Sequence, residues 1–332
     1  MEPTSTTLDL SRWREKPRGI DYRRRTIVIA GLKELWALKL SRILLSAAWM
    51  GGLLIAAAGF TFTQSIATGG WLENMATNFG PRAEALVSAF GAFVLLYPDI
   101  CIHGLFTVIF WLHSHLGLWL SLVALTVIVP RLITRDRASN ALIVYLSRPL
   151  TSLDYLLGKL GIIVSVLLLL WTGPLVAGWL VSMLLAPDRD FIQYSFSPLL
   201  RALAFNGISV VALSAIALGV SAVGRSSRVA TIIWMGLWLI LGAVSKPPHA
   251  PDWIRRASFS HDLSAVRQEV FRLDSALGDA GAQLPLISQQ FAKNLTDSGK
   301  AAEPVDFSGA IASLAAFSVL SSVVFLRKLR PE

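Results

Sequence analysis

The sequence predicts an all-α, polytopic membrane protein, and three features lead to that class. The chain of 332 residues is 54% hydrophobic and only 15% charged, whereas soluble domains carry about 25% charged residues. Its mean hydropathy is +0.59. Long apolar runs recur along it, and its lone cysteine, Cys101, excludes a fold held by intrachain disulfides. We therefore expect a single transmembrane domain over residues 1–332.

Six runs are long enough to cross a bilayer, whose hydrocarbon core of about 30 Å needs roughly 20 apolar residues. They are Ile43–Thr63, Gly104–Val129, Gly161–Leu185, Ala202–Val223, Ala230–Val244 and Phe307–Phe325. Apolar residues surround each run, which is typical of helices that face lipid. The fifth run is short, so we expect it to be tilted, broken or partly re-entrant. A further apolar stretch, Ala83–Tyr97, is expected to form an interfacial or re-entrant helix.

Lysine and arginine are divided unevenly between the two sets of connecting segments. Residues 1–42, 131–160, 224–229 and 326–332 hold 20 Lys/Arg and eight Asp/Glu, whereas 64–103, 186–200 and 247–306 hold eight and thirteen. Because basic residues stay on the inner side, we expect a multi-pass protein of the cell inner (plasma) membrane with both termini cytoplasmic. Basic residues beside anionic lipid also account for the net charge of +9, so no nucleic-acid partner is expected.

The segment before the first span is too long and too polar for a cleavable signal peptide, so we expect this span to be retained. A helix is predicted at Ile27–Leu40. Its apolar positions with helical spacing are Ile29, Leu32, Leu35, Trp36 and Leu40. Such an elbow helix would lie in the plane of the membrane interface. It would serve either as a simple anchor or also as a contact for a partner.

The connection between the second and third spans, residues 131–160, is far longer than a tight helix–helix turn requires. It predicts a short helix at Asp136–Leu146, then a break at Ser147–Pro149, where proline disfavours the helix. Thr151 is expected to cap a second helix, with Asp154 three positions later, and this helix runs into the third span. The segment should therefore be able to transmit a mechanical force, applied on the cytoplasmic side, to a transmembrane helix.

A phosphate-binding loop is not expected in this segment or elsewhere. Gly158-Lys159 is preceded at the required spacing by Leu153 instead of glycine, and Leu160 follows where Ser or Thr is needed. The chain therefore has no motif for binding ATP by that device.

In this segment the chain resembles the transmembrane subunits of type-2 ABC exporters, which are permeases with a separate ATPase partner. The residues that carry the resemblance are Arg135-Asp136, Leu146-Ser147-Arg148-Pro149-Leu150, Tyr155-Leu156-Leu157-Gly158-Lys159 and Gly224-Arg225-Ser226-Ser227-Arg228. The elbow helix, the six spans and the cytoplasmic termini are similar to that family too. The outer loop between spans five and six, about residues 247–306, departs from its compact members.

The resemblance implies a homodimer or heterodimer of permease subunits that carries two ABC ATPase (nucleotide-binding) subunits. A coupling helix within 131–160 would dock on the ATPase. The polar residues expected to serve ATPase coupling are Arg135, Asp136, Arg137, Arg148, Asp154 and Lys159; the alternative for them is a solvated basic loop. ATP and Mg²⁺ would bind to the partner, so we expect no cofactor in this chain and no enzymatic activity of its own.

For the remaining side chains that could bind a metal or take part in catalysis, packing is the favoured interpretation. Cys101, His103, His113 and His115 resemble a metal cluster, but residues two apart on a helix point roughly 200° from each other. We therefore expect the histidines of this span to face a cavity or a neighbouring helix. Tryptophans near the ends of the spans are typical of an aromatic belt.

The outer loop 247–306 contains one amphipathic helix. Its apolar stripe is Leu263, Val266, Val270, Leu273 and Leu277, and Arg267, Glu269, Arg272 and Asp274 lie off that stripe. The helix would cap the outer mouth of the bundle, lie on the outer leaflet, or bind an extracytoplasmic accessory protein.

The expected function is that of a permease subunit that couples ATP hydrolysis by its partner to export of a substrate. The substrate would pass between two subunits along spans two and five, as the resemblance implies. One alternative is a membrane scaffold or mechanotransmitter that uses the same coupling to act on an outer partner without transport. A further alternative is an integral membrane enzyme.

Overall fold

The computed structural model describes residues 19–66, 71–134, 136, 151–186, 190–245, 247, 251–273, 275–276 and 306–329. Every regular element in these ranges is a helix, which confirms the all-α class. The first part of the chain forms α1 (Ile20–Trp36), α2 (Lys39–Ile66), α3 (Trp71–Phe79), α4 (Pro81–Leu96), α5 (Pro98–Leu132), α8 (Ser152–Leu167) and the π-helix η2 (Leu168–Thr172). The second part forms α9 (Gly173–Leu184), α10 (Asp190–Val223), α11 (Ser227–Met235), the π-helix η3 (Gly236–Ile240), α12 (Leu241–Val244), α13 (Asp252–Arg256), α14 (Phe259–Phe271) and α17 (Phe307–Leu329).

Six helical stretches in the described part are long and apolar enough to cross a membrane, as predicted. They are Lys39–Thr63, Pro98–Leu132, Leu153–Leu184, Phe191–Val223, Ser227–Val244 and Phe307–Lys328. The second and fourth helical stretches begin earlier in the chain than the apolar runs Gly104–Val129 and Ala202–Val223 that predicted them. Single polar residues such as Asp99 and Arg201 end an apolar run, but they do not end a helix.

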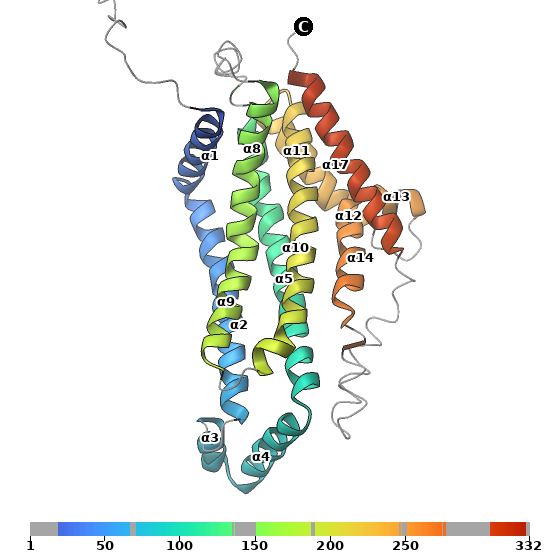
Figure 1. Ribbon diagram of the computed structural model, residues 1–332. Helices are drawn as coiled ribbons and strands as arrows, with labels where there is room; N and C mark the ends of the chain where they lie inside the picture. Colours follow the sequence, from blue (N-terminus) through green and yellow to red (C-terminus); the bar gives the residue numbers. More distant parts are fainter. Residues whose placement is uncertain are drawn as a thin grey trace, which may run out of the picture.

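The spans form an elongated bundle around α5 and α10, which pack against each other (Figure 1). On one side α2 packs along α9, and on the other α10 packs along α17. The beginnings of α1 and α8 and the end of α17 lie at the same end of the bundle, which we call the C-terminal end. The short helices α3 and α4 lie at the opposite end.

Helices α2 and α9 touch backbone to backbone because small residues face each other. A Cβ atom added at Gly178 would lie 2.4 Å from the carbonyl oxygen of Gly52, and one at Gly59 would lie 2.3 Å from the Ser182 hydroxyl. The Ser182 hydroxyl donates to the carbonyl of Ile55 across the seam at 3.2 Å. Small residues and interhelical hydrogen bonds are what hold helices together in lipid, so spans one and three are built to stay together.

The predicted elbow helix and the predicted helix before α5 are both present in the structure, and the bounds of the elbow helix differ from the prediction. The elbow was predicted at Ile27–Leu40, whereas α1 covers Ile20–Trp36 and Leu40 belongs to α2. Helix α1 packs on α8, where Gly158 and Gly161 face it. The predicted stretch Ala83–Tyr97 becomes α4. The placement of either helix in a membrane interface stays a prediction.

Two spans contain a π-helical turn, which holds one residue more than an α turn. In the third span this is η2, and in the fifth it is η3. The ring of His113 on α5 donates from Nε2 to the carbonyl of Trp171 in η2 at 3.1 Å. Gly117 faces the same indole, since a Cβ there would lie 2.3 Å from Trp171 Cδ1. The short fifth span is one continuous helical stretch, Ser227–Val244, that contains the π turn η3.

The helix predicted in the outer loop is α14, but it ends sooner than the apolar stripe suggested. Arg272 has a left-handed φ of 45° and closes the helix, so Leu273 lies beyond it and Leu277 is outside the described residues. Arg267 lies off the predicted apolar stripe, yet it is only 9% exposed. Helices α5, α10 and α17 all contact α14 and enclose more of it than one stripe covers.

Candidate functional site

Three of the six predicted coupling residues are described, and they gather at the C-terminal end of the bundle. Asp136 lies just beyond α5, and Asp154 and Lys159 lie in the first turns of α8. Arg135, Arg137 and Arg148 lie outside the described residues, as do the rest of the predicted helix Asp136–Leu146 and the break after it.

Asp154 anchors the beginning of α8 in two ways. It forms a capping box with Thr151, as predicted: the Asp154 backbone N–H donates to Thr151 Oγ1 at 3.2 Å, and the Thr151 N–H donates to Asp154 Oδ2 at 3.1 Å. Its other carboxylate oxygen accepts from Arg24 Nε at 2.8 Å and from a second guanidinium nitrogen. Asp154 is only 3% exposed. The same carboxylate therefore starts α8 and ties it to α1.

Asp136 is held by two groups of α8. The Tyr155 hydroxyl donates to Asp136 Oδ2 at 2.6 Å, and Lys159 Nζ lies 2.7 Å from the same oxygen. The ammonium group also lies 5.5 Å from the centre of the Tyr155 ring. Tyr155 is 2% exposed, and the side chains of Lys159 and Asp136 are 11% and 17% exposed. These contacts fix the chain just after α5 to the first turns of α8.

We call Arg24, Asp136, Asp154, Tyr155 and Lys159 the polar clasp. Each of its carboxylates is paired with a cation and with a hydroxyl group of the same chain. Charges that are largely removed from water need such partners, because an unpaired one is costly. The described candidates therefore direct their charges towards one another and hold α1, α8 and position 136 in one arrangement.

The end of α5 is also tied to the fourth and fifth spans. The backbone N–H of Ile133 donates to the Ser221 hydroxyl of α10 at 3.2 Å, and the Ser227 hydroxyl of α11 donates to the carbonyl of Pro130 at 2.9 Å. Pro130 leaves the previous turn of α5 without one N–H donor. Residues 137–150 thus depart from and return to positions that are fixed by side-chain contacts to four helices.

The two histidines in the middle of α5 are bonded to backbone carbonyls. In the described part of the chain, no group of three or more His, Cys, Asp or Glu side chains is placed to hold a metal ion. The imidazole of His113 donates to a backbone carbonyl, and His115 Nδ1 donates to the carbonyl of Trp111 at 3.0 Å. The two histidines face different carbonyls, as expected for residues two positions apart.

Arg24 and Tyr155 are the members of the clasp that the predicted coupling residues did not include, and Arg24 had no local signal. It is the middle residue of the run Arg23-Arg24-Arg25, which reads as ordinary inner-side charge. Its partner lies 130 positions away, so local spacing could not identify it. Position 154 was recognised because its cap is local, whereas the ion pair depends on how α1 packs on α8.

Comparison with protein families links this site to transport. Residues 116–248 match the model of the family described as ABC-2 family transporter protein. The match begins in α5, includes 131–160, and extends past α12. No curated protein matches the chain. The family is a membrane component without catalytic activity of its own, and it implies association with an ABC ATPase. The family match and the six membrane-capable helices together fit the permease subunit of a type-2 ABC transporter.

Proposed function

We propose that this chain is the permease subunit of an ATP-driven exporter, in which hydrolysis by a partner ATPase moves a substrate across the membrane. The polar clasp is the observation that carries the proposal. A nucleotide cycle can move transmembrane helices only through a contact that stays stiff while it is pushed. The clasp and the contacts at the end of α5 supply that stiffness. The chain before residue 137 is tied to α8, α10 and α11, and the chain after residue 150 is tied to α1.

Two groups of residues would then have different tasks. The first group is Asp136, Asp154 and Lys159, whose charges are paired with other residues of the chain. These residues would support the coupling segment instead of contacting the ATPase. Arg135, Arg137 and Arg148 are proposed to make the contact itself. A dimer of permease subunits would enclose the substrate path between copies of α5 and of the fifth span, and both termini would be cytoplasmic.

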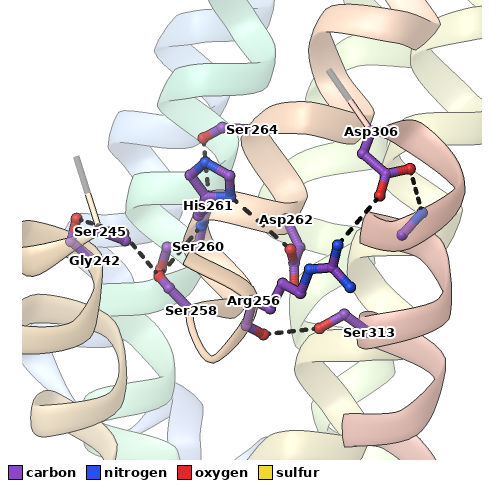
Figure 2. A network of polar contacts seen from close by, with 11 residues as sticks. Gly242, Ser245, Arg256, Ser258, Ser260, His261, Asp262, Ser264, Asp306 and Ser313 are labelled. Atoms are coloured by element: carbon purple, nitrogen blue, oxygen red, sulfur yellow. Dashed lines mark hydrogen bonds and ion pairs between the residues drawn. The ribbon is translucent and has the colours of Figure 1, made fainter. Parts of the chain in front are cut away.

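A scaffold that acts on an outer partner is the second candidate, and contacts of the 251–258 segment favour it (Figure 2). The Ser245 hydroxyl at the end of the fifth span donates to the Ser258 hydroxyl at 3.2 Å. The Ser313 hydroxyl of α17 donates to the carbonyl of Arg256 at 2.9 Å. Movement of spans five and six would therefore also move this segment, which could act on an accessory protein.

The proposal is tested by purifying the full chain together with candidate ABC ATPases. Arg148→Glu should weaken the complex. Lys159→Met should leave the complex intact but lower the ATPase stimulation by the permease several-fold, because Asp136 loses its cation. Arg272→Gln is the matched control, since Arg272 is exposed and lies just after the last residue of α14. The proposal fails if no ATPase binds, or if both inner variants couple as the control does.

A further inference from the structure

Arg267 is a buried cation without an acidic partner in the described part of the chain. It lies in the middle of α14, is 9% exposed, and forms none of the ion pairs found among the described residues. Its Nε is buried without a hydrogen-bond acceptor. Burial lowers the pKa of Arg267 to about 10, so the guanidinium still carries its charge at neutral pH. A buried charge in this position is costly unless something neutralises it.

A titratable group of α5, which contacts α14, does not neutralise that charge. His115 of α5 lies close enough to feel the Arg267 charge, and an imidazole is neutral or positive. Its Nδ1 donates to the carbonyl of Trp111, so Nε2 is the acceptor of the neutral ring. Of the two acids of α14, Glu269 is paired with Arg272, and Asp262 lies 4.0 Å from His261. The space between Arg267 and α5 is therefore positive in character.

An exposed apolar stripe begins beside this positive position. Leu112 and Trp119 flank His115 at the i−3 and i+4 positions of α5 and are 55% and 53% exposed. The indole of Trp119 makes an edge contact with Trp238 of η3, with 5.6 Å between ring centres. The stripe therefore leads from the Arg267 side of α5 to the fifth span.

We propose that Arg267 and the Leu112–Trp119 stripe of α5 bind an amphiphile with an anionic head group, the head at the guanidinium and the hydrocarbon tail along the stripe. This inference rests on the proposed function, because it names the substrate class of the permease. A cation with free donors selects a carboxylate or phosphate. Leucine and tryptophan side chains select a hydrocarbon chain, and the combination excludes small hydrophilic anions.

The test measures binding of dodecanoate and dodecanol to the full chain, purified alone in a non-ionic detergent. The two probes share a tail and differ in head-group charge. Arg267→Gln should weaken dodecanoate binding by about tenfold or more and leave dodecanol binding unchanged. Trp119→Ala should weaken both probes. Arg272→Gln just after the end of the same helix, whose arginine is paired with Glu269, should change neither.

A second measurement separates a ligand site from a structural role. Without a ligand, Arg267→Met should unfold at the same or a higher temperature than the parent chain, because it removes an unpaired buried charge. A lower unfolding temperature would mean that Arg267 holds the fold through a partner, and it would overturn the proposal. Equal dodecanoate binding by the parent chain and Arg267→Gln would do the same, as would equally tight binding of inorganic phosphate. None of these readouts needs the ATPase, so their failure would leave the permease assignment standing.

Discussion

The seam between α2 and α9 gives a sharp test of whether spans one and three form one body. Gly178→Ala adds a methyl group whose carbon would lie 2.4 Å from the Gly52 carbonyl oxygen and 2.9 Å from Ile55 Cβ. Neither neighbour is the end of a flexible side chain, so the helices must separate by about 1 Å. A gap of that size forfeits a quarter to a half of each contact energy along the seam, and overpacking costs about 1–3 kcal/mol.

The matched control is Gly207→Ala in α10, where an added Cβ meets nothing within 4 Å. There the substitution only removes the flexibility of glycine from a helix, and it should stabilise the chain by about 0.5–1 kcal/mol. The assay is thermal unfolding of both variants in the same detergent. Gly178→Ala should unfold several degrees lower than Gly207→Ala. Equal unfolding temperatures would refute close backbone packing of α2 on α9.

Three further outcomes follow from single contacts. Tyr155→Phe removes a hydroxyl donor to the Asp136 carboxylate and should lower the unfolding free energy by about 1.5–3 kcal/mol, measured by denaturant titration; no loss would mean that the contact is not formed. Ser182→Ala deletes the hydroxyl that bonds across the seam and should cost only about 0.6 kcal/mol, so a loss comparable to that of Gly178→Ala would contradict the packing argument. The pKa of Asp306 lies below its usual range, because its carboxylate accepts from the Gly309 N–H and the Ser308 hydroxyl and lies near the Arg256 guanidinium. The contribution of this carboxylate to stability should therefore persist from pH 7 to 5 and be lost only in stronger acid. In a series of unfolding curves at different pH values, Asp306→Asn should remove that acid dependence.

The six spans could be predicted because a bilayer imposes a length and a composition on each helix separately. Their true ends could not, because α5 and α10 continue through polar residues such as Asp99 and Arg201. The π turns also escaped prediction. The turn in the third span holds Trp171, whose indole lies against Gly117 of another span, and no local pattern records that contact.

The candidate site divides in the same way. The cap formed by Thr151 and Asp154 lies within four residues and was predicted correctly. The pairing of Asp154 with Arg24 depends on the packing of α1 on α8 and was missed. The burial of Arg267 was not predicted, because an apolar stripe describes one buried side of a helix, whereas α14 contacts several neighbouring helices. A role of Asp136, Asp154 and Lys159 in ATPase coupling stays a prediction.

Because of the π turns in the third and fifth spans, the direction in which the side chains of these spans point depends on the number of residues in each turn. A surplus residue in Leu168–Thr172 or Gly236–Ile240 offsets the helix on either side of it by about 100° relative to an uninterrupted α-helix. Deleting one residue from Gly236–Ile240 would restore a regular α-helix. The side chains on one side of the deletion, including Trp234, would then rotate away from their present neighbours. Such spans tolerate substitution far better than a change of length, and a one-residue deletion there should be as damaging as the loss of a whole contact surface.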